Sequence, residues 1–518
     1  MDNSINICEL LTKKAKSLIK RFDAIAFLLT FALSILVHAY MFTNKFLNHD
    51  DLGSLFGNND FGIRSGRWAL QFFTGLTGNF SSPWVIGIFS SALLGLAVVF
   101  ISHIFKIKHY PSLFCISLCI VAFPSVAATF TYMFCASSYI FSLLLSCAAA
   151  YFIKQKDFWK TALGIALLTI SIGIYQTYVA LTIALLFFSF IIELAQNQYE
   201  GKFIPVIKDV AKYVVSIILS LIFYYAILKL CLYTTGNSLE SYQGISGMFE
   251  FSTILERLSS TLGGALYYYK NGLGIYSSAF TKLVIISFIL DAVVIVKMIC
   301  QNKLYKNPLY IITIVLWGLV SPLVLGCAYL MTSTNVHQVM MFYVIISLIL
   351  PAVLADGLNI KPSFSKLKKA LAIGLATLLL AVQLFFGYEF VLVTNRCYFS
   401  MDLTAKSTLA YYSRVAQRIE ALDGFSPECH IVLIGYPDIS FNIPSSNITG
   451  DNVDGEALKV YSRHIILQTL VGANYPIYNE GPLAKEIRQT EEFKSMPCYP
   501  ADTSIQKIDG KIVVKFSE

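Results

Sequence analysis

The stretch AIAFLLTFALSILVHAYMF, residues 24–42, decides the fold class of this chain. It holds 19 residues without a charge, close to the roughly 20 apolar residues with which a helix crosses the hydrocarbon of a bilayer. The run is too long for the core of a signal peptide, and no small-residue cleavage site follows it, so we expect a retained membrane anchor.

The whole chain has the composition of a membrane protein. Of its 518 residues 56% are hydrophobic and 14% charged, and the mean hydropathy is +0.65. The sequence therefore predicts a membrane all-α fold, a polytopic bundle of about eleven transmembrane helices. Two runs, 161–175 and 177–192, are short enough to form a hairpin that does not span, which would leave nine crossings. The runs after the first are 84–105, 112–130, 134–153, 161–175, 177–192, 213–233, 283–300, 309–330, 338–355 and 370–393.

Lysine and arginine are unevenly distributed between the loops. With eleven helices and the N-terminus inside, nineteen of them fall in inner segments and six in outer loops: Lys45, Arg64, Arg67, Arg257, Lys270 and Lys282. Because cytoplasmic loops keep the excess of basic residues, this predicts a cytoplasmic N-terminus and an external C-terminus. The formal charge of +8 is thus mostly a signal of topology, and no contiguous basic face favours nucleic acid as a partner.

Three segments are then expected outside the membrane: 43–83, 234–281 and everything after residue 394. We divide the chain into a polytopic transmembrane domain, residues 1–394, and a small α/β domain, residues 395–518, in which the composition turns polar.

The sequence of the C-terminal domain carries local signals. Asp402 is a candidate cap for a helix that would run to Leu422, and residues 430–434 are predicted to form a buried strand. Asp509-Gly510, between two short alternating runs, is a strong hairpin signal. One disulfide is possible on this oxidising side, among Cys397, Cys429 and Cys498.

Asn48-His49-Asp50-Asp51 follows the first apolar run and places two carboxylates where membrane gives way to water. Adjacent side chains point about 100° apart on a helix, so Asp50 and Asp51 are expected to do different work. Moving a sugar onto a hydroxyl needs a base that takes the proton, and these two are the candidate catalytic residues. The second carboxylate could orient the first, hold His49 or bind a metal; a solvated helix start is the structural alternative.

Arg64 and Arg67 lie in the same outer segment, three residues apart and on one face if the segment is helical. Because planar guanidinium donors fork onto two oxygens, we expect them to bind the phosphate of a lipid-linked substrate. Anchoring to lipid headgroups is the alternative. The neighbouring Trp68 could stack on a sugar or belong to the aromatic belt of the membrane interface.

Weaker candidates for substrate binding are Tyr175, Gln176 and His337, at predicted outer helix ends, where they could hydrogen-bond sugar hydroxyls or pack internally. Nucleotide signatures are absent from the sequence, namely G-x-G-x-x-G, G-x-x-x-x-G-K-[ST] and a metal-binding D-x-D. A nucleotide substrate is therefore disfavoured, and group transfer at the outer surface would need a donor already in the membrane. The cofactor is unknown, with a divalent metal on Asp50 or Asp51 as one option.

Three motifs in a fixed order resemble the bacterial and phage-encoded serotype-converting O-antigen glucosyltransferases: Phe46-Leu47-Asn48-His49-Asp50-Asp51, Arg64-Ser65-Gly66-Arg67-Trp68 and Gly173-Ile174-Tyr175-Gln176-Thr177. The likeness runs over nearly the whole chain, and the order of the motifs is more specific than any one of them. The resemblance implies a GT-C-type membrane fold in the inner membrane of a Gram-negative cell. The acidic pair would then occupy the place of the GT-C acidic motif in the first outer loop.

The resemblance also implies a reaction and its partners. Glucose would pass from undecaprenyl phosphate onto lipid-linked O-antigen in the periplasm, with one companion protein that makes the lipid-phosphate glucose and another that flips it outward. The acceptor sugar does not carry over from the family. The alternatives are a GT-C enzyme that uses another prenyl-linked sugar, a lipid-sugar flippase or other transporter, and a polysaccharide polymerase. Polar residues gathered at outer helix ends, rather than along a midplane path, favour surface chemistry over transport.

Overall fold

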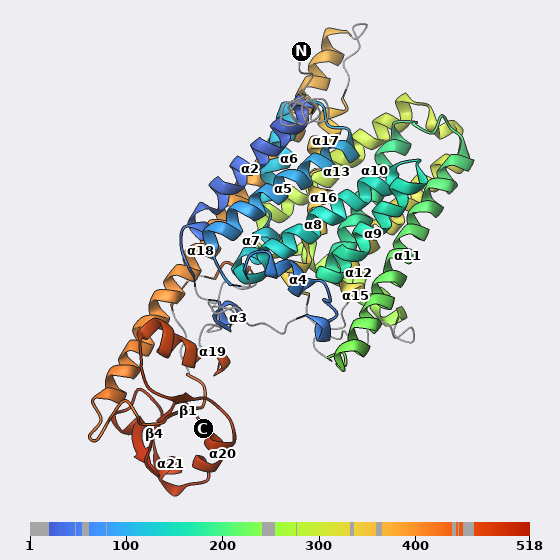
Figure 1. Ribbon diagram of the computed structural model, residues 1–518. Coiled ribbons are helices and arrows are strands. Elements are labelled where there is room, and N and C mark those ends of the chain that lie inside the picture. Colours follow the sequence, from blue (N-terminus) through green and yellow to red (C-terminus); the bar gives the residue numbers. More distant parts are fainter. Residues whose placement is uncertain are drawn as a thin grey trace, which may run out of the picture.

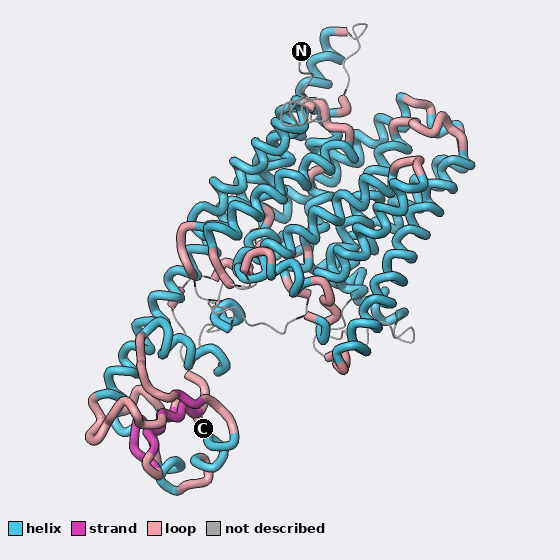
Figure 2. Tube along the Cα trace, in the orientation of Figure 1, coloured by secondary structure: helices cyan, strands magenta, loops and turns pink. Residues whose placement is uncertain are grey.

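The fold is a bundle of long helices that carries a small sheet beyond one end, as the computed structural model shows (Figures 1 and 2). The structure describes residues 20–46, 48–53, 62–78, 80–240, 254–275, 277–331, 336–358, 365–437, 442–443, 445–448 and 460–518.

Within the described ranges, nine helices or helix pairs are long and apolar enough to cross a membrane. Two shorter apolar segments, α9 (Phe158–Ile174) and Phe342–Asp356, match the remaining predicted runs. The prediction of a polytopic helical membrane protein is therefore confirmed. The nine are α2 (Arg21–Phe42), α5 (Pro83–Phe105), α6 (Tyr110–Ala122) with α7 (Pro124–Thr131), α8 (Met133–Lys154), η2 (Gln176–Tyr178) with α10 (Val179–Ala195), α11 (Phe203–Thr235), α13 (Ser278–Gln301), α14 (Pro308–Leu325) and α18 (Lys366–Glu420).

Burial separates central helices from peripheral ones. In the most apolar 18-residue stretch of α8, 94% of the residues are buried, whereas in that of α14 only 11% are buried. Leu, Ile and Val side chains are exposed along the length of α14. Small residues let the central helices approach closely: a Cβ on Gly87 of α5 would lie 2.4 Å from the ring of Phe42 at the end of α2. The peripheral apolar faces are those expected to meet lipid.

Two predicted spans are interrupted at proline. The run 112–130 is split at Phe123, because Pro124 has no N–H to continue the ladder of α6 and instead begins α7. The run 338–355 is not one helix. It consists of the 3₁₀ turns η7 (Gln338–Met340) and η8 (Phe342–Val344), then α16 (Ile345–Leu348) and α17 (Leu350–Asp356), whose first turn holds Pro351.

The prediction that a new helix begins at Asp402 is wrong, because α18 runs without a break for 55 residues. No glycine or proline stands between Tyr388 and Glu420 to stop it. Asp402 accepts hydrogen bonds from the Tyr40 hydroxyl, at 2.9 Å, and from Lys406, at 2.7 Å. The predicted domain boundary at residue 395 thus falls inside a helix that leads from the bundle to the sheet (Figure 1).

The sheet has the strand order β2-β1-β4-β3. Strands β2 (Ile477–Tyr478) and β4 (Lys511–Lys515) run parallel to β1 (Ile431–Ile434), and β3 (Ile505–Ile508) pairs antiparallel with β4. The predicted strand and hairpin are confirmed, and Asp509 and Gly510 in the turn both have positive φ. Cys397, Cys429 and Cys498 are free thiols.

Both faces of the sheet are covered. Ile431 and Leu433 of β1 pack with α18, α19 (Val460–Ile465) and the π-helix Ile466–Val471, whereas Val432 and Ile434 pack with α20 (Pro482–Ile487) and α21 (Glu491–Ser495). This alternation is the period of two that a strand buried on both faces requires.

Short elements lie between the spans and, in the case of η11, in the C-terminal domain. They are α3 (His49–Gly53), η1 (Ile63–Ser65), α4 (Leu70–Gly75), α12 (Ile254–Lys270), η5 (Gly272–Gly274), η6 (Leu304–Lys306), α15 (Cys327–Met331) and η11 (Asp502–Ser504). We call the end of the bundle that carries α3 the acidic end.

Candidate active site

The acidic pair lies on α3, a five-residue helix that begins at His49 and is preceded by Asn48. The buried Asn48 accepts the N–H of Asp50 on its side-chain oxygen, at 2.9 Å, and the N–H of Leu52 on its carbonyl, at 3.0 Å. This is the capping geometry for which asparagine is favoured. The side chain of His49 lies outside the described part of the structure. Asp50 is half-buried and Asp51 is buried, so the two carboxylates have different surroundings; that they do different work stays a prediction.

Asp51 is held by donors on both of its oxygens. Its Oδ2 accepts from Lys45 Nζ, at 2.8 Å, and from Ser81 Oγ, at 3.0 Å, while Oδ1 accepts from the backbone N–H of Phe134, at 2.9 Å. Lys45 Nζ also lies 2.6 Å from Ser81 Oγ. Asp51 is 1% exposed and Lys45 is 32% exposed, so this is a hydrogen-bonded ion pair in which the carboxylate is buried and the ammonium reaches solvent.

The contact with Phe134 places Asp51 at the N-terminus of α8. The first N–H groups of a helix have no partner within the helix and carry the positive end of its dipole, so a carboxylate is stabilised there. Asp51 thereby fixes α3 to a central helix of the bundle.

Arg67 is half-buried among tyrosines. Its Nη1 donates to the Tyr139 hydroxyl, at 2.9 Å, and its guanidinium carbon lies 5.0 Å from the centre of the Tyr175 ring. The two tyrosine rings are stacked, with centroids 4.3 Å apart. Aromatic faces attract a guanidinium and orient it, so Tyr139 and Tyr175 position Arg67 at the acidic end of α8.

The loop that carries Arg67 is fixed by a second motif. Gln176 Nε2 donates to the carbonyl of Ser65, at 2.9 Å, and the Tyr224 hydroxyl donates to the carbonyl of Gly66, at 3.0 Å. Gly66 has φ +76°, and a Cβ there would lie 2.6 Å from Gln176 Nε2. Gln176 therefore supports the arginine loop.

Trp68 packs against the end of α9. A Cβ on Gly173 would lie 2.4 Å from the indole ring, and the N–H of Ala69 donates to the carbonyl of Gly173, at 2.9 Å. The absence of a side chain at Gly173 is what lets the indole approach the backbone. Two of the motifs quoted from the sequence, residues 64–68 and 173–177, are thus docked onto each other.

Arg64 does not share a face with Arg67. The 3₁₀ turn η1 ends at Ser65, and Gly66 is left-handed, so the helical spacing that would align the two does not hold. Arg64 is exposed and pairs with Glu240, with Nε 3.1 Å from Oε1. His337 is half-buried just before η7, which packs on α7.

Sequence reasoning missed three supports of the site. In the sequence Lys45 is one of six outer basic residues, Ser81 has no local feature of a site residue, and Tyr139 lies inside an apolar run. The contact of Ser81 with Asp51 joins residues 30 positions apart, and that of Tyr139 with Arg67 joins residues 72 positions apart. Lys45 is only six residues from Asp51. Of the three, only Lys45 is indicated by the sequence: it is a positive charge close to the acidic pair in a predicted outer loop, where basic residues are disfavoured.

The surroundings of Asp51 do not fit a divalent metal, because the Lys45 ammonium already occupies its Oδ2. Among the described residues, no three His, Cys, Asp or Glu side chains are grouped as metal ligands. We therefore derive no step through a metal.

Comparison with known proteins identifies the family. The family model of the glucosyl transferase GtrII matches residues 39–351, which are 313 of the 518 residues and include every candidate site residue. No curated protein and no solved structure matches the chain. The motifs that dock onto each other around α8 all lie within the matched region, and the chain belongs to the GtrII glucosyltransferase family.

Proposed function

We propose that this protein transfers glucose from undecaprenyl phosphate onto lipid-linked O-antigen repeat units at the periplasmic face of the bacterial inner membrane. Family membership supports the sugar and the reaction class. The excess of basic residues in the inner loops supports an acidic end that faces outward. A donor within the membrane fits a chain that has many apolar helices and no nucleotide signature.

The observation that carries the proposal is the convergence of a carboxylate pair and an arginine on one end of α8. Asp51 binds the first turn of this helix, and Arg67 binds Tyr139 in its second turn. A glycosyl phosphate donor needs both kinds of group, a base for the incoming hydroxyl and a cation for the departing phosphate.

The two carboxylates receive different roles. Asp51 is buried, and Lys45, Ser81 and the helix N–H occupy its oxygens, so it positions α3. Asp50, half-buried on the same helix, is the base. In the reaction the acceptor oxygen bonds to C1 of glucose while the bond from C1 to the phosphate oxygen breaks. The hydroxyl proton passes to Asp50, and undecaprenyl phosphate leaves with the bonding electrons.

Arg67 is proposed to bind the phosphate, because stacked tyrosines already hold its guanidinium in place. Arg64, which is exposed beside Glu240, would make an outer and weaker contact with the same group. The residues that surround Arg67 would contact substrate only at the edge of the site; they are Trp68, Tyr175 and Gln176. His49 and His337 remain candidate contacts to sugar hydroxyls.

The proposed reaction requires partners. One enzyme must make the lipid-phosphate glucose, and another protein must bring it to the outer leaflet, because the acidic end is not accessible from the cytosol in this topology. The acceptor is a lipid-linked oligosaccharide whose sugar the family does not determine.

The proposal is tested with purified protein in membranes. Radiolabelled glucose should pass from undecaprenyl phosphate glucose to lipid-linked O-antigen, whereas UDP-glucose and undecaprenyl phosphate mannose should not serve as donors. Asp50→Asn should remove this activity, and the O-antigen of a host that carries the gene should gain one hexose per repeat. Movement of labelled donor across vesicles without transfer would instead establish a flippase.

Orientation has its own test. A membrane-impermeant maleimide added from outside should label the exposed position 43 in Thr43→Cys above the background of native cysteines. Labelling only after the cytosolic side is opened would overturn the periplasmic assignment.

A further inference from the structure

A pocket lies at the end of the bundle opposite the acidic end, between the start of α2 and the end of α5. It has a volume of about 390 Å³ and is lined by Lys20, Phe22, Asp23, Ser102, His103, Lys106, Ile107 and Lys108. Both helices are candidate spans, so the pocket sits where apolar helix gives way to polar chain, at the level of a lipid headgroup. None of the groups assigned to glucosyl transfer lies in it.

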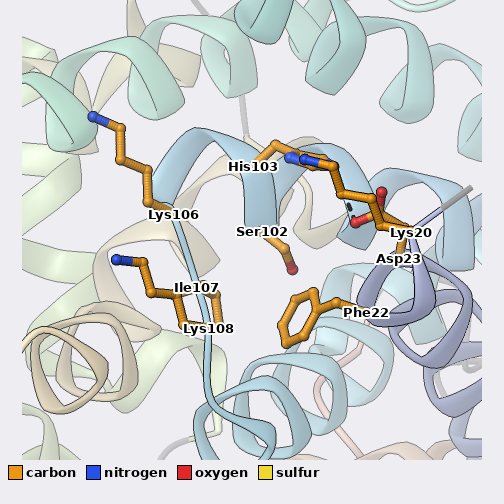
Figure 3. Close-up of a pocket in the computed structure, with 8 residues that line it drawn as sticks. All are labelled: Lys20, Phe22, Asp23, Ser102, His103, Lys106, Ile107 and Lys108. Carbon is orange, nitrogen blue, oxygen red and sulfur yellow. Dashed lines mark ion pairs between the residues drawn. The ribbon is translucent and has the colours of Figure 1, made fainter. Parts of the chain in front are cut away.

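The charges around this pocket are mostly positive. Lys20 comes from one side and Lys106 and Lys108 from the other (Figure 3). Lys106 donates to Gln198, at 2.6 Å, and lies 3.6 Å from Glu193, so its charge is partly neutralised. The acidic residue in the lining, Asp23, lies 3.1 Å from His103 Nε2. Lys20 and Lys108 are the other two cations of the lining, and Asp356, outside the lining, accepts the backbone N–H of Lys108 at 3.0 Å.

The interior of the pocket contains an unsatisfied polar group. Ser102 is 3% exposed, and its hydroxyl has no hydrogen-bond partner among the described residues. A helical serine can bond a carbonyl of the preceding turn; Ser102 does not, so its hydroxyl is available to a ligand. Figure 3 shows this hydroxyl directed into the hollow, with the Phe22 ring on one side and Ile107 on the other. The start of α2 adds backbone N–H groups at the positive end of a 22-residue helix.

We propose that this pocket binds the phosphate of an anionic membrane phospholipid. Lys20 and Lys108 supply the charge, the Ser102 hydroxyl donates to a phosphate oxygen, and Phe22 and Ile107 pack against the glycerol and the first carbons of the acyl chains. A site that combines cations, one buried donor and apolar walls fits an amphipathic phosphate ester better than a fully hydrated ion.

The test is native mass spectrometry of the detergent-purified full chain, titrated with dioctanoylphosphatidylglycerol. Lys20→Gln/Lys108→Gln should weaken binding by about 30-fold, since each lysine contributes about a factor of 5 near an anionic lipid. Ser102→Ala should weaken it by about 5-fold through the lost hydrogen bond. The matched control is Lys366→Gln/Lys368→Gln, which removes two exposed lysines at the start of α18, outside the pocket, and should leave affinity within about 2-fold.

Three outcomes would overturn the assignment. The first is an equal loss in the control pair, which would show attraction by net charge alone. The second is equal binding of dioctanoylglycerol, which has the same tails and no phosphate. The third is binding of inorganic phosphate as tight as that of the phospholipid, which would make the ligand a free phosphate. Size-exclusion profiles and thermal unfolding establish that each variant is folded.

Discussion

At the scale of single residues, the two neighbouring carboxylates are separated by their surroundings. Asp51 is bound to Lys45, Ser81 and a helix N-terminus, while Asp50 is only half-buried. We expect Asp50→Asn to lower kcat by about 10²- to 10⁴-fold, as the loss of a general base does. Thermal unfolding should show a free energy of unfolding within about 0.5 kcal/mol of wild type.

Asp51→Asn should behave differently. It leaves the partly exposed Lys45 ammonium facing an amide and removes the charge from the start of α8, so the free energy of unfolding should fall by about 1–3 kcal/mol. Activity should fall together with stability, measured on the same preparations. A variant Asp51→Asn that is as stable as wild type but inactive would show that Asp51 acts in the chemistry rather than in positioning.

The two arginines differ in the same way. Arg67→Lys retains the charge but loses the fork that Tyr139 and Tyr175 orient, so we expect kcat/KM for the donor to fall by about 10- to 100-fold, mainly through KM. Arg64→Lys is the matched control, since it keeps a cation beside Glu240 at an exposed position. Equal losses in both variants would contradict a special role for Arg67 in binding the phosphate.

The residues of the site were predictable to different extents. Asp50, Asp51 and Arg67 stand in a short polar segment between apolar runs, where few residues can carry acid–base or phosphate chemistry, so their residue types alone make them candidates. Tyr139 is not predictable from the sequence, because a tyrosine within a span has no local feature that distinguishes a hydrogen-bond partner of Arg67 from a packing residue. Its contact joins positions 72 residues apart, and only the fold brings them together.

At the scale of elements, the arginine loop depends on a left-handed glycine. Gly66→Ala places a Cβ against Gln176 and Tyr224 at φ +76°, which should cost about 1–3 kcal/mol in the free energy of unfolding. The displaced loop should also raise the KM for the donor. Gly374→Ala, in α18 with nothing within 4 Å of its Cβ, should instead stabilise by about 0.5–1 kcal/mol and leave KM unchanged. Thermal unfolding and steady-state kinetics of both variants provide the comparison.

Helix α19 carries a second testable element, His464, which lies 2.7 Å from the Asn479 amide. Burial, together with the neighbouring charge of Arg463, lowers the pKa of His464 below its usual 6.5. The unfolded chain therefore binds a proton more readily than the folded one. Stability should be constant above the unfolded pKa and should fall as the pH drops through about 6.5 towards the lower folded value.

The prediction for His464 is checked by thermal unfolding at pH 7.5 and pH 5.5 (chosen to bracket the usual pKa). Wild type should lose stability at the lower pH, and His464→Gln should lose less. Equal pH dependence in wild type and His464→Gln would refute the prediction.

Elements were predictable where one physical constraint dominates. Span length is set by the bilayer, so all eleven apolar runs correspond to helical segments. Helix ends were less predictable, since Asp402 has the residue type of a cap but α18 passes through it. An aspartate is also stable inside a helix when Tyr40 and Lys406 donate to it, and those partners are visible only in the fold.

At the scale of the whole molecule, the bundle and the C-terminal domain each contribute a buried residue to the core of the other. Leu52, next to the acidic pair on α3, is 2% exposed and belongs to the core that β1, β4 and α18 form, and α3 packs on α19. In the other direction, Ile448, 3% exposed, packs into the core of the membrane helices. The acidic helix is thus held from two sides, by α8 through Asp51 and by the C-terminal domain through Leu52.

This arrangement predicts that the C-terminal domain controls kcat through Leu52. Leu52→Ala should cost about 2–5 kcal/mol of stability and lower kcat, because α3 loses one of its two attachments and Asp50 is no longer held. The matched control is Ile487→Ala, a similar loss from the opposite face of the sheet, where the residue is 3% exposed and packs away from α3. Leu52→Met, which retains most of the volume, should recover kcat. Steady-state kinetics and thermal unfolding of the three variants test this prediction. Equal losses of stability and equal decreases in kcat in Leu52→Ala and Ile487→Ala would contradict it. The C-terminal domain would then support activity only by being folded, and Leu52 would have no part in placing Asp50.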